Sequence, residues 1–388
     1  MKDSLADAAS IVGVGQTEFS KAAGRSETRL ACEAIVAAVA DAGLHMSDID
    51  GLATFTIDPV EETELARALG IQDVHWSSRM PYGGAGSQGI LLHAAAAVAT
   101  GVARAVVVYR SVRARSGSRF GAATVAARPT SSHSGTTAMQ WCTPFGLITP
   151  ASWMSLNATR YMHQFGVKSE DFGRAVVQLR AYASTNPNSH FFEHPITLAD
   201  HQASRWIAEP SIRLFDCCQE TDGAVALVIV PTNRAADSPQ PVRISAAASV
   251  APFETEVATD HYSRDLSVMT SSASLARQLF GAAGLAVDDL DVAMIYDAFT
   301  PVLLMQLEAL GFCGPGEAKD FIAEGGLGPD AAIPCNTNGG LIGEGYIHGV
   351  NLTLEAVHQL RGDAVNQVSD AEVALVAANR SGVILTRG

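Results

Sequence analysis

Two tyrosines in this sequence stand where a side chain could move protons. Tyr346 and His348 belong to the run GEGYIHG, residues 343–349, in which three glycines leave the backbone unusually free. Tyr296 follows an apolar segment and opens the tetrapeptide YDAF, residues 296–299. A phenol can donate a proton directly and can accept one once it has ionised. The pair therefore indicates acid–base chemistry.

The phenol of Tyr346 needs help to act as a base. With an ordinary pKa of about 10, only about one phenol in a thousand is ionised at pH 7. Lowering that pKa by about two units requires roughly 2.7 kcal/mol of preferential phenolate stabilisation. Glycine N–H groups, a helix dipole or a cation could supply part of it. We predict that Tyr346 takes a proton from a substrate hydroxyl, alone or with a water. Tyr296 then acts as the acid or orients the substrate, and the sequence leaves these roles exchangeable.

Two neighbours are predicted to support the tyrosines. Asp297 could orient a tyrosine, or it could cap a helix whose pattern begins at Thr300-Pro301. His348 follows Tyr346 by two residues, so it could contact the phenol or face away from it. Both alternatives remain open for each residue.

The tyrosines lie in the second half of an internal repeat. Residues 42–55 (AGLHMSDIDGLATF) and 283–296 (AGLAVDDLDVAMIY) each follow an alanine-rich helical pattern and enter a buried strand. Each half then has a glycine-rich turn, a helix and a strand, with the turns at 82–89 and 338–349. Short buried strands need helical crossovers, so two halves that pack helices between two sheets are expected. The two turns could converge on one pocket and offer N–H groups to an oxyanion.

The repeat sets the predicted domain boundaries. Residues 1–110 and 211–240 form the first half, and residues 241–388 form the second. Residues 111–210 form an insert, with helical patterns over 152–166 and 169–185. Long insertions often cover an active site.

Composition and charge narrow the class of function. With 47% hydrophobic and 17% charged residues, the 388-residue chain fits a globular enzyme. Six scattered cysteines fit a reducing cytoplasm, and neither a secretory signal nor a membrane-spanning run is apparent. A net charge of −14 argues against nucleic acid as a ligand.

The stretch YRSVRARSGSR departs from this acidic average, because it supplies Arg110, Arg113, Arg115 and Arg119. It predicts either a solvated or subunit-contacting surface, or a site for phosphates or an acidic partner.

Two weaker patterns do not support a cofactor or metal. Residues 84–89 match G-x-G-x-x-G, but no acidic residue ends a second strand about twenty residues on, so a nicotinamide site is not expected. His190 and His194 have helical spacing without a third ligand, so no metal site is expected.

Four motifs in order resemble the thiolase superfamily: TDGA at 221–224, YDAF at 296–299, LGFCGPGEAKDFI at 310–322 and NGGLIGEGYIHG at 338–349. They are most similar to its lipid-transfer-protein group, the sterol-carrier-protein-x thiolase-like proteins, and the resemblance covers most of the chain. It implies an α/β fold with αβαβα layers, built from two duplicated halves, with the insert as a loop domain in the first half.

The chain departs from a working thiolase at the positions that carry the chemistry. The nucleophilic cysteine of the family would fall at about Gly84, its histidine at Tyr346, and its second cysteine at about Ala378. Among the remaining cysteines, Cys217 and Cys218 precede a predicted strand, whereas Cys313 and Cys335 are expected in loops outside the pocket, so none of them is expected to replace the nucleophile. Because Claisen chemistry through an acyl-enzyme needs an activated nucleophile, a thiolase mechanism is not expected.

Tyrosines in place of thiolase residues resemble the retro-aldolases of steroid side-chain degradation. This implies a carbon–carbon lyase that cleaves a bulky β-hydroxyacyl-CoA of the steroid 17-hydroxy-20-carboxyl type. The products would be a ketone and propionyl-CoA or a similar short thioester. A retro-aldol step needs a base, an acid and a site for the enolate, but no covalent intermediate. CoA enters as part of the substrate, so no separate cofactor is expected.

The resemblance also implies partners. They are a second copy of the chain in a homodimer and a small zinc-ribbon and OB-fold protein, together forming a heterotetramer. Two alternatives remain open. One is a thiolase or acyl-CoA acyltransferase with an unrecognised nucleophile, sensitive to iodoacetamide and dependent on free CoA. The other is a non-catalytic thiolase-like scaffold for a partner enzyme.

Overall fold

A computed structural model describes residues 5–81, 84–117, 119, 142–236, 238–254 and 265–388. Within this part of the chain, nine strands form one sheet in the order β3-β2-β4-β7-β1-β8-β11-β10-β9. The strands of this sheet are β1 (Ala9–Gln16), β2 (Gly51–Phe55), β3 (Trp76–Met80), β4 (Val106–Arg113), β7 (Asp222–Pro231), β8 (Val242–Ser249), β9 (Val292–Ile295), β10 (Val373–Ala377) and β11 (Ser381–Arg387). A separate hairpin joins β5 (Trp206–Ala208) to β6 (Ile212–Arg213).

The strand order carries the internal repeat. In the first half β2 is parallel to β4, and β7 lies antiparallel to β4 and β1. In the second half β9 is parallel to β10, and β11 lies antiparallel to β10 and β8. The expected duplication is therefore visible in the pairing, and the exact domain boundaries stay a prediction.

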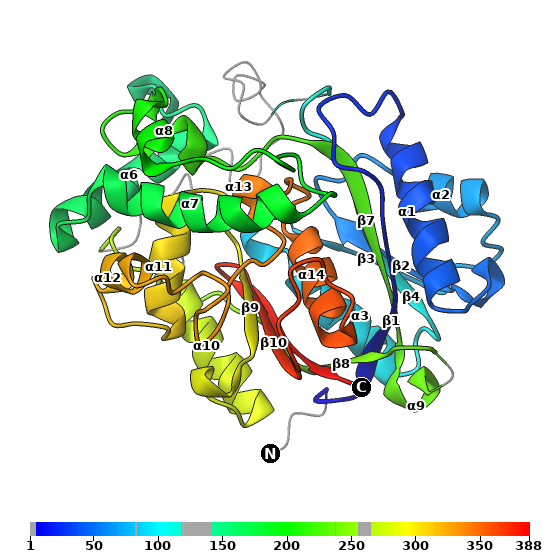
Figure 1. Cartoon of the computed structure of the whole chain (residues 1–388). Helices are drawn as coiled ribbons and strands as arrows, with labels where there is room; N and C mark the ends of the chain where they lie inside the picture. Colours follow the sequence, from blue (N-terminus) through cyan, green and yellow to red (C-terminus); the bar gives the residue numbers. More distant parts are fainter. Residues whose placement is uncertain (1–4, 82–83, 118, 120–141, 237, 255–264) are drawn as a thin grey trace.

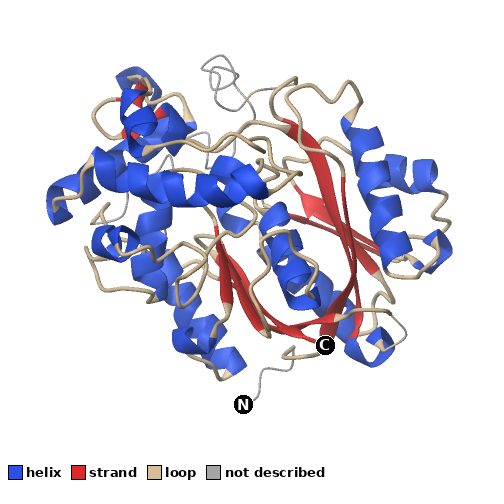
Figure 2. Ribbon diagram, in the orientation of Figure 1, coloured by secondary structure: helices blue, strands red, loops and turns tan. Residues whose placement is uncertain are grey.

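The two predicted sheets are joined into one. Antiparallel pairing of β1 with β8, over Ala9 to Ile11, connects the halves. Figure 2 shows the consequence, two banks of strands that flank a pair of helices and meet at their lower end. The layered α/β arrangement is thus confirmed, while the separation into two sheets is incomplete.

Helices fill the layers around these strands (Figure 1). On the outer face of the first half, α1 (Glu27–Asp41) packs against β1, β4 and β7, and α2 (Glu62–Leu69) packs on α1. Between the banks lie α3 (Gly89–Ala99) and α14 (Val350–Arg361), which contact strands of both halves. On the far side, α10 (Thr270–Ala283) covers β8 and β11 and packs against α11 (Thr300–Leu310). Since α3 is apolar on nearly every side, only a position between two sheets buries it fully.

The insert lies across the second half. Its helices α6 (Pro150–Phe165) and α7 (Ser169–Thr185) match the two predicted patterns, and α8 (Leu198–Ala203) follows them. Helix α7 packs on α8, on α12 (Ala318–Ala323) and on the short helix α13 (Gly340–Gly343). Because α13 opens the second glycine-rich turn, helix α7 of the insert packs on the turn that carries Tyr346. A further short helix, α9 (Thr232–Ala235), follows β7.

A membrane-spanning helix would need a long apolar run, and none of the helices in the described ranges has one.

Candidate active site

The structure brings the two predicted tyrosines into direct contact. Tyr296 directly follows β9, where its N–H donates to the Ala377 carbonyl at 2.8 Å. Tyr346 lies in the loop between α13 and α14. Their hydroxyl oxygens are 2.8 Å apart, and their rings meet edge to face with centroids 6.4 Å apart. This distance is a hydrogen bond, so a proton can pass between the two phenols.

The first glycine-rich turn converges on the same pair. A Cβ atom at Gly84 would lie 2.8 Å from the Tyr296 hydroxyl oxygen and 3.9 Å from that of Tyr346. Gly84 also has a φ of +53°, a conformation that favours glycine. The phenol hydroxyls thus lie beside Gly84, the position at about which the resemblance to thiolases places the family's nucleophile.

Asp297 fixes the second turn. Its carboxylate accepts hydrogen bonds from the N–H groups of Leu341 at 2.8 Å and Ile342 at 3.3 Å. The predicted cap of the helix at Thr300 is not formed; the Asp297 carboxylate binds the N-terminal N–H groups of α13 instead. Burial raises the pKa of Asp297 to about 7, although the two N–H groups act to lower it.

Other contacts use further N–H groups of this turn. The Tyr346 N–H donates to the Thr221 hydroxyl at 2.9 Å, and the Gly340 N–H donates to the Asn338 side chain at 2.9 Å. Together with Leu341 and Ile342, these groups are committed within the protein. The expectation that this turn offers free N–H groups to an oxyanion is therefore wrong for these four residues.

Burial holds both phenols in their neutral form. Burial raises the pKa of Tyr346, while the hydrogen bond from Tyr296 and the charge of Arg110 oppose the rise. Burial raises the pKa of Tyr296 even more clearly, and the neighbouring Tyr346 adds to this effect. A helix dipole was expected to lower the pKa of Tyr346, but the cost of desolvating the phenolate outweighs this effect. In addition, α14 begins only at Val350, beyond Tyr346.

Cys218, which precedes β7, lies beside this site. Its N–H donates to the Ala298 carbonyl at 2.9 Å, and its ionisation would raise the pKa of both tyrosines. Burial raises the pKa of the Cys218 thiol well above its ordinary value, so the thiol stays protonated. Although Cys218 is near the tyrosines, a protonated thiol is not an activated nucleophile.

His348 contacts the phenol of Tyr346 and does not face away. The two ring centroids are 4.8 Å apart, and the imidazole Nδ1 accepts a hydrogen bond from Arg110 Nε at 2.9 Å. Burial and the charge of Arg110 hold the pKa of His348 well below its ordinary value. Arg110 itself belongs to the arginine-rich stretch, for which a surface was one expectation, yet it is 1% exposed. A charged residue inside the apolar strand ARAVVVYRSV is the signal that could have revealed it.

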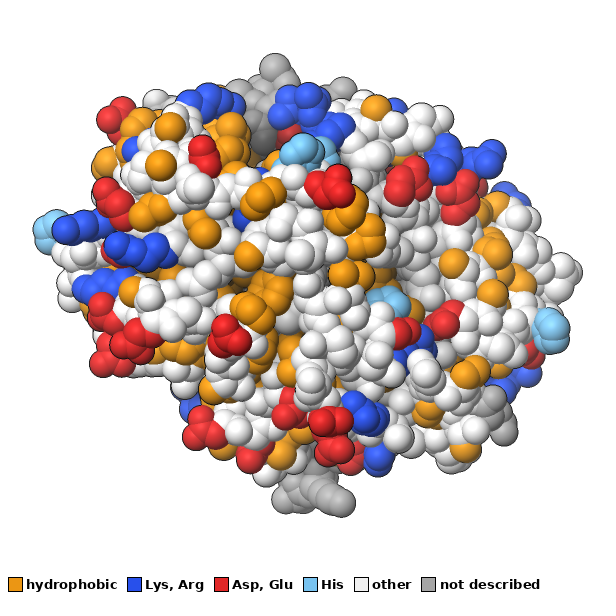
Figure 3. Space-filling model, in the orientation of Figure 1, with side chains coloured by type: hydrophobic (Ala, Val, Ile, Leu, Met, Phe, Trp, Pro, Cys, Tyr) orange, Lys and Arg blue, Asp and Glu red, His pale blue; other side chains and the backbone are white. Residues whose placement is uncertain are grey.

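Two further cations of that stretch, Arg115 and Arg119, lie near Lys21. Lys21 Nζ donates to the Glu220 carbonyl at 3.0 Å and to Gln219 Oε1 at 3.1 Å, while Arg119 pairs with the Glu220 carboxylate at 2.7 Å. Burial, and next the charge of Arg115, lower the pKa of Lys21 to about 8. We call Lys21, Arg115 and Arg119 the cationic cluster. It lies beside Tyr346, because Glu220 forms a β-bridge with Tyr346. Figure 3 shows several Lys and Arg side chains along the upper edge of this face.

Glu344 is a buried acid that sequence reasoning missed. Its carboxylate accepts from three asparagine side chains, those of Asn338 at 2.6 Å, Asn351 at 2.8 Å and Asn186 at 3.3 Å. Asn186 follows α7, so the carboxylate ties the insert to the Tyr346 loop. Burial raises the pKa of Glu344 to about 8.

Replacing Glu344 by glutamine is expected to change how stability depends on pH. The folded pKa exceeds the ordinary value of 4.5, so Glu344 favours the folded state at low pH. This contribution is lost as the pH rises from about 4.5 to about 8. The free energy of unfolding of Glu344→Gln, relative to that of the wild type, should therefore be higher by a few kcal/mol at about pH 8.5 than at about pH 5. Denaturant unfolding at the two pH values measures this gain, with Glu324→Gln, an exposed glutamate, as the control. A gain that is equal at both pH values would contradict the assignment.

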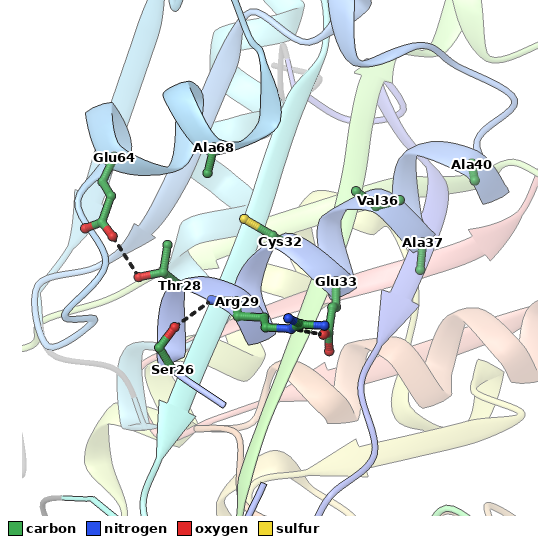
Figure 4. Close-up of a pocket in the computed structure, with 10 residues that line it drawn as sticks. All are labelled: Ser26, Thr28, Arg29, Cys32, Glu33, Val36, Ala37, Ala40, Glu64 and Ala68. Atoms are coloured by element: carbon green, nitrogen blue, oxygen red, sulfur yellow. Dashed lines mark hydrogen bonds and ion pairs between the residues drawn. The ribbon is translucent and has the colours of Figure 1, made fainter. Parts of the chain in front are cut away.

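A groove elsewhere on the molecule does not belong to this site. Figure 4 shows a groove of about 880 Å³ between α1 and α2, where Thr28 donates to Glu64 at 3.0 Å. Its lining comes from Ser26 and from these two helices, which pack on the outer face of the first half, whereas the tyrosines belong to the core on the other side of the sheet.

Of the two histidines considered for a metal, His194 donates its backbone N–H to the Phe191 carbonyl at 3.0 Å, and His190 has contacts on both its backbone and its ring. The His190 N–H donates to the Glu344 carbonyl at 2.8 Å, and its ring packs edge to face on Phe191. Across the residues that the structure describes, no three metal-ligating side chains gather as a site.

Comparisons with known proteins agree with the fold and the motifs. Residues 255–386 match the family described as thiolase C-terminal domain-like. The chain is 49% identical over 386 residues to a steroid side-chain-cleaving aldolase of Thermomonospora curvata, covering 98% of each chain. It is 48% identical to the 17-hydroxy-3-oxo-4-pregnene-20-carboxyl-CoA lyase of Mycobacterium tuberculosis, covering 98% of this chain and 100% of that one.

A solved structure is similar over the whole length. The Ltp2-ChsH2(DUF35) aldolase superposes with a TM-score of 0.93 at 47% identity, covering 99% of both chains. The strand pairing, the motif order and these relatives lead to one conclusion. This chain belongs to the thiolase superfamily, in its sterol-carrier-type thiolase-like family.

Proposed function

We propose that this protein is a carbon–carbon lyase that cleaves a steroid β-hydroxyacyl-CoA by a retro-aldol reaction. The substrate is of the 17-hydroxy-20-carboxyl type, and the products are a 17-ketosteroid and propionyl-CoA. The names of the relatives at 49% and 48% identity support the reaction class. The observation that carries the proposal is the 2.8 Å contact between the phenols of Tyr296 and Tyr346, beside the position of the absent nucleophile.

The proposed reaction moves one proton from the β-hydroxyl to the α-carbon. The β-hydroxyl donates its proton to the Tyr346 oxygen, and its oxygen becomes the ketone carbonyl as the Cα–Cβ bond breaks. The electron pair of that bond enters the thioester enolate. Tyr346 passes its own proton to Tyr296 across their hydrogen bond, and Tyr296 protonates the α-carbon. After one turnover Tyr346 carries the proton from the substrate and Tyr296 carries the proton from Tyr346. Exchange of these protons with water restores the starting arrangement.

This relay suits two phenols with raised pKa values. A free phenolate would be rare at neutral pH, whereas a relay between neutral phenols keeps the number of protons on the pair constant. Tyr346 is the better proton acceptor toward the substrate, because the charge of Arg110 favours its ionised form. Tyr296 lacks such support, which suits it to donate.

We further propose that the cationic cluster binds the phosphates of the CoA moiety. In a chain with a net charge of −14, an anionic substrate needs local positive charge. Lys21 is half-buried, and the two acceptors of its Nζ are a carbonyl and an amide oxygen. The cluster also flanks the loop that holds Tyr346. A homodimer and a DUF35-type partner, like the one named with the similar aldolase structure, would complete the assembly.

The test is incubation with 17-hydroxy-3-oxo-4-pregnene-20-carboxyl-CoA, with and without the DUF35 partner, followed by mass spectrometry. We expect ketone and propionyl-CoA in equal amounts, without added CoA and without inhibition by iodoacetamide. A requirement for free CoA, together with inactivation by iodoacetamide, would favour a thiolase or acyltransferase. Absence of turnover with the partner present would favour a scaffold. The matching pantetheine thioester, which lacks the phosphates, should show a raised KM.

A further inference from the structure

Arg110 is an arginine sealed inside the protein. It lies on β4, is 1% exposed, and its Nη1 donates to Asp58 Oδ2 at 2.8 Å. The same carboxylate is held by the N–H groups of Ser111 and Val60, each at 2.9 Å. Asp58 is therefore fixed on several sides, and Arg110 is fixed through it.

The other edge of the guanidinium points to the Tyr346 loop. Arg110 Nε donates to His348 Nδ1 at 2.9 Å, so the neutral imidazole carries its proton on Nε2. His348 has a φ of +53°, which costs a residue other than glycine of order 1–3 kcal/mol. A strained residue persists where its surroundings hold it, and here the bond to Arg110 and the ring contact with Tyr346 do so.

Several ionisable groups act on the Tyr346 phenol. Cys218, before β7, disfavours its ionised form. Tyr296, after β9, favours it through the hydrogen bond, and Arg110, from β4, favours it through its charge. His348 is held neutral and contributes a ring contact rather than a charge. Of these groups, Arg110 brings the positive charge.

We propose that Arg110 is a positioning and charge-setting residue for the reaction. Asp58 anchors Arg110, and Arg110 Nε orients His348 against Tyr346. The charge of Arg110 stabilises the negative charge that develops on the Tyr346 oxygen during the proton relay. The catalytic importance of this arrangement rests on the proposed function, whereas its effect on the ionisation of Tyr346 does not. The site thereby includes Arg110 from β4 and Asp58 from the loop before α2, in addition to the loop that holds His348 and Tyr346.

The two members of the ion pair should act in opposite directions. Removing the charge of Arg110 takes away stabilisation of the Tyr346 phenolate. Removing the charge of Asp58 leaves Arg110 uncompensated, which strengthens that stabilisation. If the ion pair were purely structural, both substitutions would act on the ionisation of Tyr346 in the same direction, because each leaves one buried charge without its partner.

The experiment places a fluorinated tyrosine at position 346, whose lower intrinsic pKa brings ionisation into an accessible pH range, and follows it by fluorine NMR. Arg110→Met should raise its titration midpoint by about one pH unit, and Asp58→Asn should lower it. If Arg110→Met does not fold, the double variant Asp58→Asn/Arg110→Met leaves no buried charge from this pair, and it too should titrate above the parent. Midpoints that all stay unchanged, or that move in the same direction for both single variants, would overturn the proposal.

A matched control is available at another buried arginine. Arg361 pairs with Asp41 at 2.7 Å, and its side chain is 4% exposed. Arg361→Met should leave the midpoint at position 346 unchanged. With the unlabelled protein, Arg110→Met should also lower kcat by up to about tenfold, the factor in rate that corresponds to the expected shift of one pKa unit. If the parent shows no turnover, the proposed function fails, and the NMR titration still decides the role of Arg110.

Discussion

Tyr346→Phe is expected to lower kcat for cleavage of the steroid acyl-CoA by roughly 10²–10⁴-fold. Phenylalanine keeps the ring and its packing but can neither accept the hydroxyl proton nor pass one to Tyr296, 2.8 Å away. KM should change little, because the substrate loses a partner for the reaction rather than its binding surface. Stability should fall by about 1 kcal/mol, the usual worth of one hydrogen bond. Steady-state kinetics, together with unfolding in denaturant, measures both effects.

The matched control is Tyr161→Phe. Tyr161 is also a buried tyrosine, and its hydroxyl donates to Glu308. It should lose stability like Tyr346→Phe but keep kcat. A folded Tyr346→Phe protein with the kcat of the wild type would rule out the relay, since no other described phenol bonds to Tyr296.

Gly340→Ala is expected to destabilise the protein by about 3 kcal/mol or more and to abolish most of the activity. A Cβ atom at Gly340 would lie 2.2 Å from Asp297 Oδ2, and its φ is +67°. Asp297 cannot move away freely, because it holds the N–H groups of Leu341 and Ile342. The turn must therefore shift, and Tyr346 shifts with it. Thermal or denaturant unfolding and kcat report the two effects.

Gly362→Ala is the control that separates backbone strain from the steric overlap between a Cβ at position 340 and Asp297. Gly362 has a φ of +82°, but no other atom lies within 4 Å of the place where its Cβ would be. This control should lose only about 1 kcal/mol, the cost of a left-handed backbone in alanine, and should keep its activity. Equal losses for both variants would show that the contact with Asp297 does not matter.

The parts of the fold that follow from local pattern could be predicted. Helices α6 and α7 match the apolar periodicity of residues 152–166 and 169–185, because their buried faces repeat at helical spacing. The repeat predicted equivalent strands, and Tyr296 follows a strand as predicted. Tyr346, predicted at the start of a helix, lies instead in the loop between α13 and α14. The sequence pattern could not predict that the two halves share a single sheet, because β1 pairs with β8 over only three residues at a strand end.

The supporting contacts of the site lay beyond local pattern. Arg110 and His348 are 238 residues apart in the chain, and Asn186 and Glu344 are 158 apart. Which side chains meet over such separations depends on how the sheets and the insert pack. The pKa of Tyr346 depends on burial in the same way. Desolvation, which no motif encodes, outweighs the glycine N–H groups and the helix dipole that the sequence suggested.

The pairing of β1 bears on how the chain is made. β1 lies between β7 and β8, with Ala9 opposite Pro231 and Ile11 opposite Val242. On the ribosome, this N-terminal segment must wait until more than 230 further residues have been synthesised before both its edges can be covered. Such long-range closure is slow, so an unpaired strand stays exposed during translation. Helix α1, which packs on β1, can cover one face of this strand early, whereas the two edges of β1 stay open until β7 and β8 have been made.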